Sequence, residues 1–180
     1  MLNSPVWRGI PRYVFILGLI LGASTVSAGL LVTGSVLRLP LPAAVWAALI
    51  AALAIMVVLR EFGVVRLWLP ENKRLVPEHV DRYGRVFGPL QFGFELGTGL
   101  RTYLPSGLPH LLAIAVALLA APLPALAAGV GFGVGRASMT VANLRFSDDN
   151  SWDDAWIGSE RTIKVILVAA FCLACGFVLL

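Results

Sequence analysis

The chain has 180 residues, of which 58% are hydrophobic and 13% charged, and its mean hydropathy is +0.86. Soluble domains are about 45–50% apolar and about 25% charged, so this composition excludes an ordinary soluble protein. Three runs, 13–37, 39–59 and 102–135, contain no Asp, Glu, Lys or Arg. Each is as long as the roughly 20 apolar residues that one crossing needs. The sequence therefore predicts an all-α, polytopic membrane bundle, and its net charge of +4 does not indicate a nucleic-acid-binding protein.

The N-terminal part predicts two membrane helices. The first is expected over about 13–36, because this apolar run is longer than the core of a signal peptide. A secretory signal with a cleavage site at 26–28 is the alternative. A turn around Pro40 and Pro42 leads into a second helix over about 42–59, whose alanines favour helix formation.

The segment 60–85 is the longest polar stretch and holds six of the fourteen Lys and Arg residues. Trp68 lies among apolar residues within it. This mixture is typical of a basic cytoplasmic or interfacial segment that binds anionic lipid, with the tryptophan at headgroup depth. A solvated loop with one buried tryptophan is the alternative.

Three later crossings are expected over about 86–108, 111–135 and 162–180. At about 1.5 Å per residue, 102–135 would reach about 50 Å, whereas the apolar core of a bilayer is about 30 Å thick. The run must therefore hold one crossing and a turn, or two short crossings hinged at 122–124. The expectation is five transmembrane helices, with six as the alternative.

The positions of the cations favour five crossings. With the N-terminus in the cytoplasm, five helices place twelve of the fourteen Lys and Arg on the inner side and leave only Arg38 and Arg101 outside. Positively charged residues mark cytoplasmic segments, and acidic residues count little. We therefore expect an inner (plasma) membrane protein whose N-terminus is cytoplasmic.

Glycine-rich stretches at 17–24 and 92–99 are similar to each other, and Pro-Leu-Pro-Ala occurs at both 40–43 and 122–125. These similarities indicate an internal two-helix repeat, as in many transporters. Chance similarity among Gly, Ala and Leu is the alternative. Small residues four apart let helices approach closely in lipid. The pairs Gly18/Gly22 and Gly93/Gly97, and two more pairs within 129–135, are therefore predicted to be packing faces.

Glu95 is the candidate functional carboxylate, because it lies inside the third expected crossing. A carboxylate at that depth is costly unless it is neutralised or paired, and it is a functional hypothesis by default. Gln91, Thr98 and Thr102 recur around it at helical spacing and would form one polar stripe. These four residues are the predicted substrate or ion path. A hydrogen bond between helices, or a pairing with a cation on another helix, is the alternative role for Glu95.

Cys172 and Cys175 form a C-x-x-C in the last expected crossing. This spacing suits a redox pair, but the surrounding Ala, Phe and Leu favour inert apolar residues. The sequence offers no further ligands for a metal site and no nucleophile–base arrangement. We therefore expect no metal and no cofactor, and an enzyme is disfavoured.

The residues Phe-Gly-Pro-Leu-Gln-Phe-Gly-Phe-Glu-Leu-Gly at 87–97, followed by Tyr-Leu-Pro at 103–105, resemble the glycine-rich helix of a known group. That group comprises the cytochrome c biogenesis and DsbD-type transmembrane electron carriers and the related methylamine-utilisation membrane proteins. The resemblance implies repeated helix units and a fold that also serves small-solute exporters. The carriers have a membrane cysteine beside a proline, whereas 102–105 and 24–27 here have none, so a thiol relay is not implied.

Three functions remain open from the sequence. The first is a transporter-like multi-pass protein with a polar path around Glu95. The second is a noncatalytic membrane subunit or assembly factor, which would dock a membrane-protein partner or a second copy of itself. The third is a thiol-redox membrane protein that uses Cys172 and Cys175.

Overall fold

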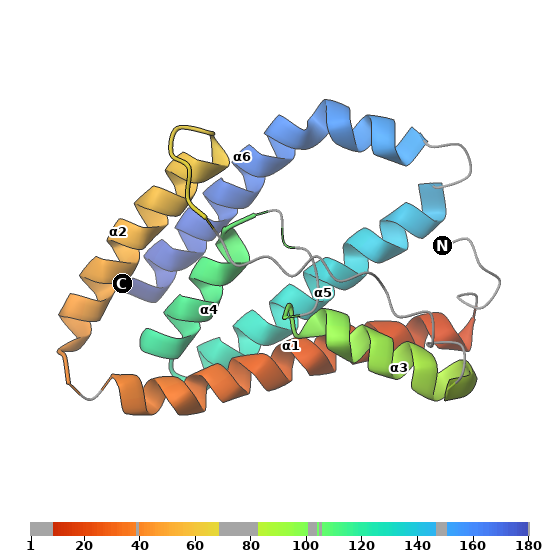
Figure 1. Ribbon diagram of the computed structural model, residues 1–180, viewed down its shortest axis with the longest axis horizontal. Helices are drawn as coiled ribbons and strands as arrows, with labels where there is room; N and C mark the ends of the chain where they lie inside the picture. The colour runs from red at the N-terminus through yellow and green to blue at the C-terminus, as the bar shows by residue number, and fades with distance from the viewer. Residues whose placement is uncertain are drawn as a thin grey trace.

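The computed structural model describes residues 9–38, 40–68, 83–100, 104, 106–146 and 151–179; within 143–146, 151–156 and 172–179 it describes only the course of the helix. The described residues form helices and no strand (Figure 1), which confirms the predicted all-α class. The six helices are α1 (Ile10–Leu37), α2 (Ala43–Glu61), α3 (Gly84–Gly97), α4 (Leu108–Leu118), α5 (Pro122–Phe146) and α6 (Ser151–Leu179).

Among the residues whose side chains the structure describes, three helices are long and apolar enough to cross a membrane: α1, α2 and the part of α5 over Pro122–Ala142. They support the expected membrane protein. With 14 and 11 residues, α3 and α4 are only about 21 Å and 16 Å long at 1.5 Å per residue. Neither can cross a core of about 30 Å by itself.

The third expected crossing differs from the helix that forms. Instead of running to residue 108, α3 ends at Gly97, where the backbone turns away from the helix path. The Thr98 hydroxyl donates to the Glu95 carbonyl oxygen at 2.7 Å and accepts from Leu100 N at 3.3 Å. Gly99 then adopts a φ of 70°, which glycine tolerates and other residues rarely do. The helix stops because these groups replace its own hydrogen bonds.

A second break separates α4 from α5 at 119–121. Proline lacks the N–H that would continue a helix but fits its first turn, so Pro122 begins α5. The break lies directly before the alternative hinge at 122–124 and divides the crossing expected over 111–135. Downstream, α6 begins at Ser151, well before the expected residue 162. The described residues therefore form six helices, and the number of transmembrane crossings stays a prediction.

The similar glycine motifs of α1 and α3 pack against each other. A Cβ added to Gly22 would overlap the carbonyl oxygen of Phe94, and one added to Gly97 would overlap that of Leu19. Gly93 likewise faces the carbonyl of Phe15. Higher residue numbers in α1 face higher numbers in α3, so the two helices run in parallel. The predicted packing role of Gly18/Gly22 and Gly93/Gly97 is confirmed.

The helix α5 packs on α1 in the opposite direction. Gly133 approaches Ile20, and the earlier Gly129 approaches Ser27, so the two helices are antiparallel. By contrast, Gly131 and Gly135 have no neighbouring atom that a Cβ would meet. One of the two predicted glycine pairs in 129–135 is therefore a packing face, and the other is open.

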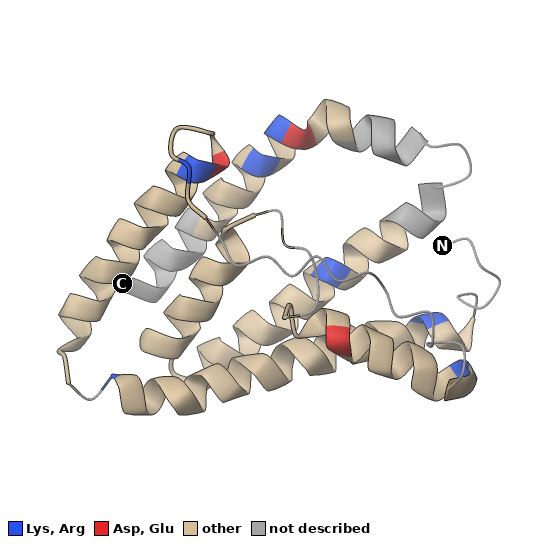
Figure 2. Cartoon of the chain, viewed as in Figure 1, with Lys and Arg blue, Asp and Glu red and all other residues tan. Residues whose placement is uncertain are grey.

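Most helix ends lie on one of two sides of the molecule. Figure 1 places the start of α1, the end of α2 and the starts of α3 and α6 along the upper and right side. Most of the described Lys and Arg residues lie there (Figure 2). The end of α1, the start of α2 and the end of α4 lie at the lower left, where Arg38 is the only cation among the described residues.

Candidate functional site at the break after α3

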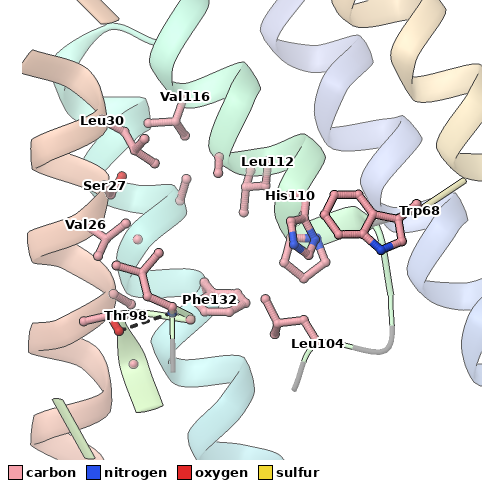
Figure 3. Close-up of a pocket in the computed structure, with 18 residues that line it drawn as sticks. Val26, Ser27, Leu30, Trp68, Thr98, Leu104, His110, Leu112, Val116 and Phe132 are labelled. Atoms are coloured by element: carbon pink, nitrogen blue, oxygen red, sulfur yellow. Dashed lines mark hydrogen bonds between the residues drawn. The ribbon is translucent and has the colours of Figure 1, made fainter. Parts of the chain in front are cut away.

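A cavity of about 560 Å³ lies where α3 ends. Its walls come from α1, the segment after α3, α4 and α5, together with Trp68 from the segment after α2 (Figure 3). Together α3 and α4 follow α1: Gly97 faces Leu19 in its first half, and Ala117 meets Gly34 near its end. The cavity therefore occupies the gap that the interrupted helix leaves beside α1.

The walls of the cavity are mainly apolar. Val26 and Leu30 of α1 face Leu112 and Val116 of α4, and Phe132 of α5 lies at the centre of the view in Figure 3. No Asp, Glu, Lys or Arg is among the lining residues that the structure describes. Ligand pockets are commonly 300–1,000 Å³, mostly apolar and equipped with a few polar groups. The cavity fits this description.

The two hydroxyl groups at the cavity already donate their hydrogen bonds to the backbone. Ser27 is 5% exposed and donates to the carbonyl of Ala125, which ties α1 to the start of α5. Thr98 donates to the Glu95 carbonyl, as described above. Each hydroxyl oxygen can still accept a hydrogen bond, but its donor is engaged.

Two rings, His110 and Trp68, stand on the other side of the cavity. Figure 3 shows the imidazole of His110, in the first turn of α4, beside the indole of Trp68. Trp68 is 86% exposed and lies at the mouth of the cavity. The His110 Nδ1 atom is enclosed by protein and has no hydrogen-bond partner in the described part of the chain. Buried polar atoms are normally paired, so this atom is unusual.

A buried carboxylate holds the N-terminal end of α4. The Glu61 side chain is only 4% exposed, and its Oε1 accepts from Gly107 N at 2.7 Å. The same oxygen lies 3.2 Å from Arg60 Nη1, and Arg60 Nε donates to the Leu67 carbonyl at 3.1 Å. Negative charge is favourable at a helix N-terminus, where free N–H groups point outward. Glu61 thereby fixes the helix that carries His110.

The other end of α4 is held by Arg38. Its Nε and Nη1 each donate at 2.9 Å, to the carbonyls of Ala117 and Ala120, and Nη2 lies 3.4 Å from the Val116 carbonyl. The last carbonyls of a helix have no partner within it. A cation at this end satisfies them and complements the helix dipole. Charged groups thus hold α4 at both ends.

Arg38→Ala is expected to lower the free energy of unfolding by about 1–2 kcal/mol, because the carbonyls at the end of α4 lose their donors. Arg38→Lys should recover only part of this loss, since an ammonium lacks the planar fork of a guanidinium. Denaturation by SDS in mixed micelles, followed by circular dichroism, measures both changes. Arg161→Ala, at an exposed position of α6, is the control. Equal stability of Arg38→Ala and the unmodified protein would contradict the role given to Arg38.

The structure separates the residues of the predicted polar stripe. Gln91 Nε2 donates to Glu95 Oε1 at 3.2 Å, so these two side chains do meet on α3. Thr98 lines the cavity, whereas Gln91 and Glu95 are not among its lining residues. Thr102 lies outside the described residues. Among the described residues, the stripe is interrupted because α3 ends at Gly97, before Thr98 can continue its face.

The cysteine pair and most of the basic segment fall outside the described side chains. Cys172 and Cys175 lie on the helix α6, but their side chains are outside what the structure describes, and the redox hypothesis stays a prediction. Among the described residues, no three His, Cys, Asp or Glu side chains come together to hold a metal ion. Most of 60–85 also falls outside the described residues, apart from its ends at 60–68 and 83–85.

Sequence reasoning missed Ser27, Glu61 and His110 as site residues. Glu61 carries a recognisable signal, since it is an acidic residue at the end of an apolar helix. His110 and Ser27 carry none, because their roles depend on contacts with distant parts of the chain. Comparison with protein-family models, curated proteins and solved structures finds no match for this chain. The resemblance to transmembrane electron carriers therefore stays a prediction.

Proposed function

We propose that this protein is a small multi-pass membrane transporter that binds its solute in the cavity after α3. The observation that carries the proposal is the interrupted helix. Neither α3 nor α4 is long enough to cross a bilayer, but in succession they follow α1 from its first half to its end. In our proposal they form one broken crossing, the third of five.

Broken crossings suit transport for a physical reason. Non-helical backbone is tolerated at membrane depth only where protein buries it or where it lines a cavity. Transporters use such interruptions to place substrate sites near the middle of the bilayer. Here the interruption begins at Thr98 and Gly99, and both residues line the cavity. The proposal places the solute against these residues and moves the site away from Glu95.

The distribution of cations supports the topology of this proposal. Arg12, Arg60 and Arg85 lie near helix ends on one side of the molecule, opposite Arg38. Under the positive-inside rule, the side rich in cations faces the cytoplasm. The N-terminus would then be cytoplasmic. A role as a membrane subunit, which the sequence leaves open, gains no comparable support from the described residues.

Cysteine accessibility tests the proposal. In a background with Cys172 and Cys175 replaced by Ala, Thr98→Cys is expected to react with a small charged methanethiosulfonate applied from either side of oriented vesicles. The reason is that a transport site must open in turn to both sides. Mass spectrometry measures the labelled fraction over time.

Ala28→Cys is the matched control, because Ala28 is an exposed residue of α1 that does not line the cavity. In lipid it should resist the charged reagent from both sides. Labelling of Thr98→Cys from one side only would be consistent with a binding site but would contradict transport. Absence of labelling from both sides would contradict an accessible cavity altogether.

A further inference from the structure

We infer that the cavity binds a neutral, largely apolar molecule carrying a single hydroxyl group, and that the His110 imidazole pairs with that hydroxyl. This inference rests on the proposed function, since it names the class of solute for the same cavity. Three observations carry it: the charge of the walls, the free ring nitrogen of His110, and the position of Trp68.

The walls select a neutral and mostly apolar molecule. No charged side chain is among the described residues that line the cavity, and Val26, Leu30, Leu112 and Val116 form much of its surface. An ion placed there would lose its hydration without gaining a partner of opposite charge, which is strongly unfavourable. An apolar body would instead gain from burial against these side chains. The cavity therefore disfavours ions and charged metabolites.

His110 supplies the polar contact. His110 lines the cavity, and its Nδ1 atom is enclosed by protein without a hydrogen-bond partner among the described residues, so we assign the ligand contact to Nε2. A neutral imidazole carries its proton on one nitrogen and accepts at the other. A hydroxyl can both donate and accept, so it pairs with Nε2 in either tautomer. The hydroxyl groups of Ser27 and Thr98 already donate to backbone carbonyls.

Trp68 marks the route into the cavity. Its indole, in the segment after α2, is 86% exposed and stands beside His110 in Figure 3. Exposed tryptophans of membrane proteins prefer the headgroup region, where one end of a molecule is wet and the other apolar. An apolar molecule with one hydroxyl concentrates in that same region. It would meet Trp68 first and His110 next.

Quenching of tryptophan fluorescence tests the inference on the full chain in lipid nanodiscs. The probe is 4-bromophenol, whose bromine quenches a neighbouring indole and whose hydroxyl is protonated at pH 7, since phenols titrate near pH 10. We expect saturable quenching above the linear background of partitioning into lipid. The saturable part should disappear in Trp68→Phe. In His110→Leu the affinity should fall about five- to tenfold, as expected for the loss of one hydrogen bond.

Two comparisons make the result decisive. The matched probe 4-bromotoluene has a methyl group in place of the hydroxyl and should bind His110→Leu and the unmodified protein equally well. Ala113→Phe places a ring in the cavity and should abolish saturable binding. Equal affinity of 4-bromophenol for His110→Leu and the unmodified protein would overturn the inference, and so would undiminished binding to Ala113→Phe.

The two proposals fail in different ways. If 4-bromophenol shows no saturable binding while Thr98→Cys reacts from both sides, the solute class is wrong and transport stands. If binding depends on His110 while Thr98→Cys reacts from one side only, the site is real and transport is wrong. A His110→Gln variant, which keeps a hydrogen-bonding group at this position, should retain most of the affinity and so separates hydrogen bonding from packing.

Discussion

Glu61→Ala is expected to lower the free energy of unfolding by about 3 kcal/mol, the largest effect of any single side-chain truncation considered for this protein. The variant leaves the Arg60 guanidinium, 18% exposed, without its carboxylate, and it leaves the Gly107 N–H without an acceptor. The Gly107 N–H and the Arg60 guanidinium remain partly removed from water, and the contacts with Glu61 no longer offset their lost hydration. Reversible unfolding in SDS mixed micelles measures the change.

A second variant at Glu61 separates the contribution of its charge from that of its hydrogen bond, and a variant at an exposed ion pair is the control. Glu61→Gln keeps an oxygen that accepts from Gly107 N but removes the charge, so about half of the loss is expected to return. Glu160→Ala is the control, because Glu160 and Lys164 form an exposed pair at 2.7 Å that is worth at most about 0.5 kcal/mol. If Glu61→Ala is no more destabilising than Glu160→Ala, the anchoring role of Glu61 is refuted.

Gly22→Ala is expected to destabilise the protein by about 1–3 kcal/mol, because its methyl group would overlap the backbone of Phe94 and force α1 and α3 apart. Gly133→Ala should act similarly, since its methyl group would lie 2.7 Å from Ile20 Cα. The same micelle denaturation measures both variants. The separation of α1 and α3 should also reduce the helix contacts that frame the cavity.

Matched glycines lie on the same helices. Gly29 of α1 and Gly131 of α5 have nothing within reach of an added Cβ. Gly29→Ala and Gly131→Ala should therefore be neutral or stabilising by up to about 1 kcal/mol, as expected from the higher helix propensity of alanine. Similar losses in all four variants would show that glycine itself, rather than close helix packing, matters at these positions.

For the similar motifs at 17–24 and 92–99, the sequence predicted the packing role but not the packing partner. Their spacing correctly indicated close helix packing, since small residues four apart make a flat face on any helix. It did not indicate that the two motifs are each other's partners. That pairing gives their similarity a packing reason, because two parallel helices that bury the same kind of face in each other need the same small residues.

Less of the candidate site could be predicted from the sequence. Glu95 stood out because a carboxylate in an apolar run is costly, but in the structure Gln91 donates to it and it does not line the cavity. The polar stripe assumed a continuous helix through Thr102. Local hydrogen bonds of Thr98 and the positive φ of Gly99 end the helix, and neither can be recognised by hydropathy. Of the three residues of the predicted path that the structure describes, Thr98 alone lines the cavity.

Length, composition and charge by themselves determined that this is an all-α chain with apolar helices long enough to cross a membrane. These properties follow from the bilayer, because every helix that crosses it must be long and apolar whichever helices it packs against. The tertiary structure decided which helix is interrupted and what surrounds the gap. Ser27 and Glu61 acquire their roles from hydrogen-bond partners that lie 98 and 46 positions away in the chain. His110 acquires its role from the cavity that it lines. Such contacts depend on how helices are placed against each other, which no local pattern encodes.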